Sequence, residues 1–120
     1  MRRLTVLFLM FFASCPVLAD EADVVAVVPA RESDGTWRFS VTVRHADTGW
    51  EHYADRWDIR APDGRMLDAR VLLHPHVEEQ PFTRALGGVV IADDVKWVTV
   101  RAHCSVDGYG GQEMRVELER

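Results

Sequence analysis

Strict alternation of apolar and polar residues constrains this chain most strongly, because it has the two-residue period of a β-strand. Between residues 36 and 44 every second position is apolar and the intervening positions are polar. The apolar positions are Trp37, Phe39, Val41 and Val43. Successive side chains of a strand point to opposite faces of a sheet, so this segment predicts a strand with one face buried.

The same pattern predicts about seven short strands in one all-β antiparallel sandwich. The expected strands cover residues 23–28, 36–44, 53–61, 65–73, 82–91, 95–104 and 113–118. Turn sequences such as Ser33-Asp34-Gly35 and Pro62-Asp63-Gly64 separate them, and Pro29 is expected to close the first. The segment 65–73 is expected to turn Leu67, Ala69, Val71 and Leu73 inward.

Two resemblances agree with this architecture. Residues 98–103 read Val-Thr-Val-Arg-Ala-His and are followed by Gly-Tyr-Gly-Gly and Val-Glu-Leu. This ending resembles the last hairpin of immunoglobulin-like and fibronectin type III-like domains. Residues 43–57 and 72–84 look like segments of small exported prokaryotic proteins without an assigned role. These resemblances imply an immunoglobulin-like sandwich, with Trp57 in its core, and no particular function.

The first nineteen residues have the features of a secretory signal peptide. Arg2 and Arg3 precede an apolar run over residues 4–12, which is too short to span a bilayer, and small residues lead to Ala19. We expect cleavage after Ala19, which leaves residues 20–120 as one periplasmic or secreted domain without a transmembrane segment. The alternative is a lipoprotein that is processed at Cys15.

Charge and cysteine content limit the partners of the exported part. Removing Arg2 and Arg3 leaves 12 basic against 19 acidic residues, a net charge of −7. Nucleic acid is therefore excluded as an expected partner, because phosphate binding requires a basic face. Cys104 remains as a single cysteine, so no internal disulfide is expected; it is predicted to be buried, with linkage to a second chain or metal ligation as alternatives.

His74 and His76 are the candidate metal ligands. Residues two apart in an extended segment point to the same side, and imidazole nitrogens bind copper and zinc. His52 is the third candidate, and strand parity predicts that His74 and His76 are exposed. His45 is expected at the rim, bonded to a main-chain carbonyl or to Asp47. His103 and Cys104 are neighbours in a strand and are not expected to share an ion.

The leading hypothesis is a non-enzymatic binding or interaction module of unknown ligand. Aromatic and charged residues occur in two expected loop regions, 45–56 and 74–84. The candidate contact residues are Trp50, Tyr53, Arg56, Phe82 and Arg84. No acid–base pair or nucleophile motif is recognisable, so we do not expect an enzyme. A copper- or zinc-binding protein centred on His74 and His76 is the alternative; the oligomeric state is not predicted.

Overall fold

A computed structural model describes residues 20–120, and the predicted signal peptide, with both of its processing sites, lies outside the described residues. These residues form seven strands, paired antiparallel throughout, and contain no helix long and apolar enough to cross a membrane. The strands are β1 (Asp23–Arg31), β2 (Trp37–Arg44), β3 (Ala54–Arg60), β4 (Met66–Val71), β5 (Phe82–Val89), β6 (Trp97–Cys104) and β7 (Met114–Glu117).

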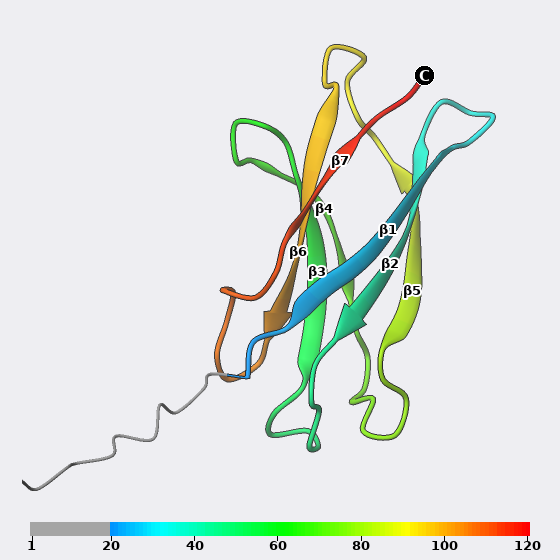
Figure 1. Ribbon diagram of the computed structural model, residues 1–120. Coiled ribbons are helices and arrows are strands. Elements are labelled where there is room, and N and C mark those ends of the chain that lie inside the picture. The colour runs from blue at the N-terminus through cyan, green and yellow to red at the C-terminus, as the bar shows by residue number, and fades with distance from the viewer. Residues whose placement is uncertain (1–19) are drawn as a thin grey trace, which may run out of the picture.

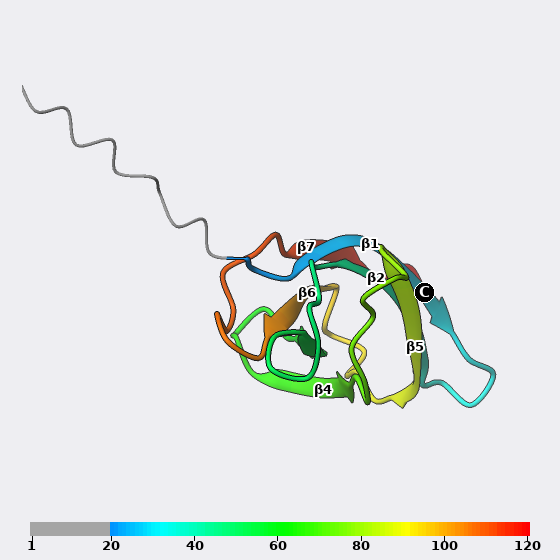
Figure 2. The same cartoon turned by 90° about the horizontal axis from the view of Figure 1, so that it is seen from below.

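The strands form two facing sheets, which confirms the predicted all-β sandwich. One sheet has the order β1-β2-β5 and the other the order β4-β3-β6-β7. Figures 1 and 2 show the two layers from the side and from one end. The hydrophobic core lies between them, because the apolar positions of each alternating strand point toward the opposite sheet. Its largest members include Trp37, Phe39, Trp57, Ile59 and Phe82.

Trp57 and Cys104 take the places that the sequence predicts for them. Both side chains are fully buried, and Cys104 is a free cysteine. Burial of a large apolar side chain contributes about 1.5–3 kcal/mol to stability relative to its exposure to water. Packing of residues such as Trp57 therefore stabilises the sandwich where an immunoglobulin domain of the antibody type would use a disulfide.

Strand β1 is longer than predicted. We expected the strand to end before Pro29, but the pairing with β2 continues through Pro29 to Arg31. β1 has a hydrogen-bonded strand on one side only, since it stands first in its sheet. An edge strand accommodates proline, because the missing N–H can face away from the neighbouring strand.

The predicted inward face of residues 65–73 is confirmed for Leu67, which packs against the core, but it is wrong for Ala69, Val71 and Leu73. In the register Arg70 lies opposite Trp57, and directly paired residues point to the same side of a sheet. Because Trp57 points into the core, Ala69 and Val71 point outward; Val71 is 60% exposed, while Leu72 is buried. β4 is an edge strand, where a long side chain such as Arg70 can border the core; Nε of Arg70 is buried and has no hydrogen-bond partner within residues 20–120.

The N-terminal segment is held against the connection between β6 and β7. The amide of Val24 donates to the carbonyl oxygen of Gln112 at 2.8 Å, and the amide of Gln112 donates to Oδ1 of Asp23 at 2.7 Å. A Cβ atom on Gly111 would overlap the carbonyl of Ala22. Only glycine permits this close passage, which fixes the position of the residues that precede β1.

Candidate functional site

Two connections that the sequence analysis singled out lie together at one end of the sandwich. Residues 45–53 join β2 to β3, and residues 72–81 join β4 to β5. Both lie at the lower end in Figure 1, and Figure 2 views this end from below. We call this part of the molecule the loop end.

The buried carboxylate of Asp47 joins the two connections. Its Oδ1 accepts a hydrogen bond from the amide of Ala54 at 3.0 Å and lies 2.5 Å from Nδ1 of His45. Its Oδ2 accepts a hydrogen bond from the amide of His76 at 2.7 Å. Asp47 thus satisfies donors from both connections and from the start of β3, which fixes their relative positions.

Gln80 adds a second link. Its side-chain oxygen accepts a hydrogen bond from the amide of His45 at 3.0 Å, and its side-chain nitrogen donates to the carbonyl of His76 at 2.9 Å. The two connections therefore form one hydrogen-bonded structure.

His76 is buried, and the prediction that it is exposed is wrong. Only 5% of its surface is accessible, and its ring stacks on Phe82 with centroids 3.9 Å apart. The Arg84 guanidinium lies 2.9 Å from Nε2 and can donate to it, while the amide of His76 is bonded to Asp47. Burial, followed by the positive charge of Arg84, lowers the pKa of His76 below its ordinary value of 6.5.

The three predicted metal ligands are divided between two places. His74 is exposed as predicted; its ring lies 4.5 Å from that of His76, and its Nδ1 lies 2.9 Å from the carbonyl oxygen of Pro75. Nε2 of His76 already accepts from Arg84, and a guanidinium beside a nitrogen opposes a cation there. His52 lies apart from this pair, near His45.

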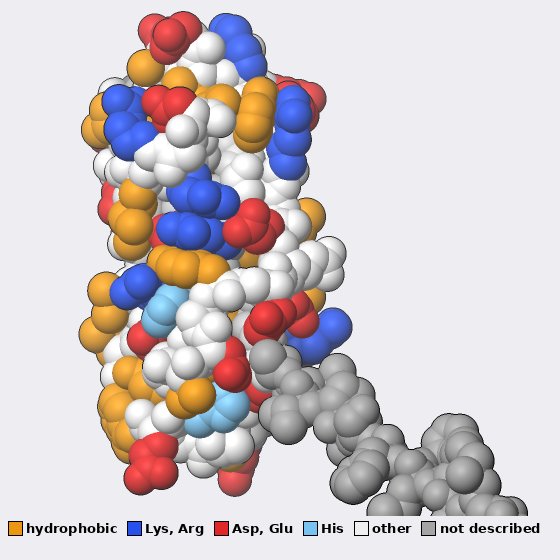
Figure 3. All heavy atoms as spheres, turned by 90° about the vertical axis from the view of Figure 1, so that its left-hand side faces the viewer, with side chains coloured by type: hydrophobic (Ala, Val, Ile, Leu, Met, Phe, Trp, Pro, Cys, Tyr) orange, Lys and Arg blue, Asp and Glu red, His pale blue; other side chains and the backbone are white. Residues whose placement is uncertain are grey.

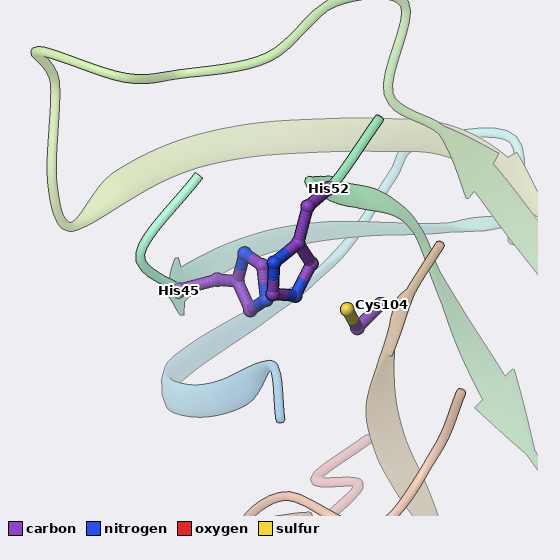
Figure 4. A group of neighbouring side chains, drawn as sticks. All are labelled: His45, His52 and Cys104. Atoms are coloured by element: carbon purple, nitrogen blue, oxygen red, sulfur yellow. The ribbon is translucent and has the colours of Figure 1, made fainter. Parts of the chain in front are cut away.

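His45, His52 and Cys104 form a separate cluster. One donor atom from each lies within 4.8 Å of the others. Figure 4 shows the three side chains pointing toward one another: His45 follows β2, His52 precedes β3, and Cys104 ends β6. His45 and Cys104 are buried, and His52 is half-buried. Within residues 20–120, no other group of three or more His, Cys, Asp or Glu side chains brings its donor atoms this close together.

Two carboxylates border this cluster. Oδ2 of Asp107 lies 3.3 Å from Nε2 of His52 and 3.8 Å from Sγ of Cys104. Oδ2 of Asp20 lies 3.6 Å from Nε2 of His45 and 4.0 Å from Nε2 of His52. Burial is the main reason that the pKa of the Cys104 thiol is raised, and the carboxylates of Asp107 and Asp20 act in the same direction.

The sequence anticipated the partners of His45 and the direction of His103 relative to Cys104. Both expected kinds of partner lie beside His45: Asp47 next to Nδ1, and the main-chain oxygen of Asp20 2.8 Å from Nε2. His103 points away from Cys104 and lies 2.6 Å from Asp55. The sequence did not predict that Cys104 lies near two histidines. This proximity follows from the pairing of β6 with β3, which places Cys104 opposite Ala54, next to the 45–53 connection.

The five predicted contact residues have different environments. Trp50 is exposed and packs edge-to-face on Tyr53, which is half-buried. Phe82 is buried in the core under His76. Arg84 holds His76 and also pairs with Glu79 at 3.2 Å. Phe82 and Arg84 therefore support the loop end from within, while Trp50 projects from it.

Arg56 belongs to a second polar network, on the outer face of the four-stranded sheet. Its Nε donates to the hydroxyl of Tyr109 at 3.0 Å. The buried carboxylate of Asp58 accepts from the same hydroxyl at 2.7 Å and from Nε of Arg101 at 2.9 Å. Arg101 also lies over the Tyr109 ring, 3.6 Å from its centroid. Figure 3 shows basic side chains gathered midway along this side of the molecule.

Comparison with known proteins identifies a relative without defining a ligand. The chain is 39% identical over 99 residues to a protein of Halomicrobium mukohataei that is described as "Putative lipoprotein". The match covers 82% of this chain and 48% of the relative, so the chain spans about half the length of the curated protein it matches. No family model matches the chain, and no solved structure matches it.

Proposed function

We propose that this chain is an exported, non-enzymatic binding module that contacts its partner with the loop end. The observation that carries the proposal is the bonding of the 45–53 and 72–81 connections to each other through Asp47 and Gln80. Recognition surfaces are commonly built from loops that a rigid scaffold positions. Loops that are already ordered lose less conformational entropy on binding.

Exposed apolar side chains at the loop end supply the contact area. Trp50 is 67% exposed, Leu73 is 75% exposed and Val77 is 55% exposed. Tryptophan is enriched among the residues that dominate binding energies at protein interfaces. Exposed apolar groups on an ordered surface favour a protein or another partly apolar ligand as the partner.

Two further assignments belong to this proposal. The N-terminal signal pattern and the lipoprotein description of the relative both support export. We favour cleavage after Ala19, with lipid attachment at Cys15 as the alternative, and we assign the sandwich to the immunoglobulin-like or fibronectin type III-like class on its two-sheet strand order.

The test compares two double variants of the exported protein in a crosslinking and capture experiment. Trp50→Asp/Leu73→Asp alters the loop end, and Val28→Asp/Val90→Asp is the matched control at exposed valines of β1 and of the segment after β5. The loop-end variant is expected to retain at least tenfold less of a specific partner, and the control is expected to retain it fully. Equal retention by both variants would refute recognition through the loop end.

The alternative hypothesis, copper or zinc binding centred on His74 and His76, is less well supported. His52 lies elsewhere, and Arg84 faces Nε2 of His76. Titration with Cu(II) and Zn(II) tests it against a His74→Ala/His76→Ala variant. Loss of metal uptake in that variant alone would favour the His74–His76 pair over the loop-end recognition proposal.

A further inference from the structure

The cluster of His45, His52 and Cys104 combines residues that are suited to hold a metal ion. It is independent of the proposed recognition function and does not include the predicted pair of His74 and His76.

Asp47 orients His45 toward the cluster. The carboxylate is itself fixed by the amides of Ala54 and His76, and it lies 2.5 Å from Nδ1 of His45. A carboxylate in this position holds the proton on Nδ1 and leaves the lone pair of Nε2 available as a ligand. This is the arrangement found around metal-ligating histidines, where a second group fixes the ring.

The other side of the same ring presents an electrostatic problem that a cation would solve. Nε2 of His45 lies 2.8 Å from the main-chain oxygen of Asp20, with Oδ2 of Asp20 at 3.6 Å. If Nδ1 carries the single proton of a neutral ring, the lone pair of Nε2 faces an oxygen lone pair. A metal ion beside Nε2 removes this repulsion, and a second proton on the ring would do so as well.

His52 provides the second nitrogen. Its Nε2 is buried and has no hydrogen-bond partner in residues 20–120. Oδ2 of Asp107 lies 3.3 Å from it, but without the geometry of a hydrogen bond. A buried polar atom without a partner requires an explanation, and metal ligation provides one.

Cys104 and Asp107 complete a donor set that suits zinc. Sγ of Cys104, at the end of β6, lies 3.8 Å from Oδ2 of Asp107, which the 105–113 connection brings to within 3.3 Å of Nε2 of His52. Imidazole, thiolate and carboxylate groups are all zinc ligands. The negative charges of the thiolate and the carboxylate together balance the two positive charges of the zinc ion. Ligands of one tetrahedral zinc lie roughly 3.3–3.8 Å apart, so donors within 4.8 Å reach it by small side-chain rotations.

We propose that His45, His52 and Cys104 bind one zinc(II) ion, with the carboxylate of Asp107 as the fourth ligand. Asp47 is a positioning residue that holds the ring of His45. The ion would join the end of β2, the start of β3 and the end of β6 at a point next to the loop end.

The experiment titrates the exported protein, as purified from cells and freed of metal, with Zn(II) and with Co(II) as a spectroscopic probe. We expect one equivalent of either ion to bind, with a rise in melting temperature. Co(II) is expected to give the absorption of a tetrahedral site together with a thiolate-to-cobalt charge-transfer band. That band reports directly on Cys104, the single cysteine of the described residues.

Cys104→Ser and His52→Ala are the test variants, and His74→Ala is the matched control at an exposed histidine. Cys104→Ser should abolish the charge-transfer band, both test variants should weaken zinc binding at least tenfold, and His74→Ala should leave it unchanged. His52→Ala changes a half-buried loop residue, so it keeps the test valid if Cys104→Ser fails to fold.

Three results would overturn the proposal. The first is an absence of zinc binding by the unmodified protein. The second is zinc binding that persists in His52→Ala but disappears in His74→Ala. The third is uptake of copper but not of zinc by these residues.

Discussion

Asp47 and Asp58 are both buried carboxylates, but they are held by different kinds of partner. Asp47 accepts hydrogen bonds from the main-chain amides of Ala54 and His76 and lies against the buried ring of His45. Asp58 accepts from two side chains, Arg101 and Tyr109. The hydrogen bonds of Asp47 therefore fix the backbone of the two connections. Those of Asp58 fix side chains that lie on the outer face of the four-stranded sheet.

The Asp47 and Asp58 networks also differ in how far their members are exposed to water. The charge of Asp58 is matched by Arg101, whose side chain remains 20% exposed and can reach water if its partner is removed. The side chains of Asp47 and His45 are both fully buried. Removal of Asp47 therefore leaves donors without partners, while removal of Asp58 leaves donors that water can reach.

The largest expected effect is that of Asp47→Ala. Several buried donors lose their acceptor, so we expect the free energy of unfolding to fall by about 3 kcal/mol, as measured by urea denaturation. Asp94→Ala, at an exposed acid in the connection before β6, is the control and should change stability by less than about 0.5 kcal/mol. Equal losses of stability in Asp47→Ala and Asp94→Ala would show that the hydrogen bonds of Asp47 do not stabilise the fold.

A smaller loss is expected from Asp58→Ala. The exposed end of Arg101 limits the penalty, so we expect about 2 kcal/mol, and about 1 kcal/mol for Tyr109→Phe, which removes one hydroxyl from the network. Urea denaturation under the same conditions gives the comparison. A loss in Asp58→Ala that exceeds the loss in Asp47→Ala would reverse the ranking of the two networks.

The pH dependence of stability sharpens the comparison further, because His76 is bonded to Asp47. Its pKa in the folded protein is below the ordinary value of 6.5, through burial and through Arg84 and His74, with Asp47 and Glu79 opposing them. The unfolded chain therefore binds more protons in this range, and stability should fall as the pH is lowered through 6.5 toward the folded pKa.

Replacement of His76 tests this assignment. His76→Gln should flatten the part of the stability curve below pH 6.5, and His74→Ala should change it much less, since His74 is exposed. Thermal unfolding across a pH series measures both variants. An unaltered slope in His76→Gln would assign the pH dependence to another group.

The smallest expected effect is that of a non-chelating reductant. Cys104 is buried and unpaired, so neither network depends on a disulfide among the described residues. The melting temperature should be the same with and without the reductant. A large decrease would indicate a dimer linked through Cys104.

The fold was predictable wherever a strand buries one face. All seven strands were anticipated from alternation and turn residues, and β2 is the clearest example, with its apolar side fully enclosed. The face of β4 was not predictable from alternation, because an edge strand can turn polar residues such as Arg70 toward the inner side. The error in β4 extended to His76, whose exposure had been inferred from the same parity.

The candidate site was predictable only where its contacts are local. The pairing of His45 with Asp47 spans two residues and follows from ordinary side-chain chemistry. The approach of Cys104 to His52 depends on the pairing of β3 with β6, which brings distant segments together. Spacing in the sequence favoured His74 and His76 instead, since it contains no information on Arg84 beside them.

The position of Asp20 has a consequence for orientation at a membrane surface. Asp20 lies beside His45 and His52, so the chain enters the sandwich at the loop end. A lipid on Cys15 would leave five peptide steps to Asp20, a reach of at most about 18 Å. The loop end of a lipid-anchored form would then lie close to the bilayer, whereas cleavage after Ala19 would remove this restriction on its orientation.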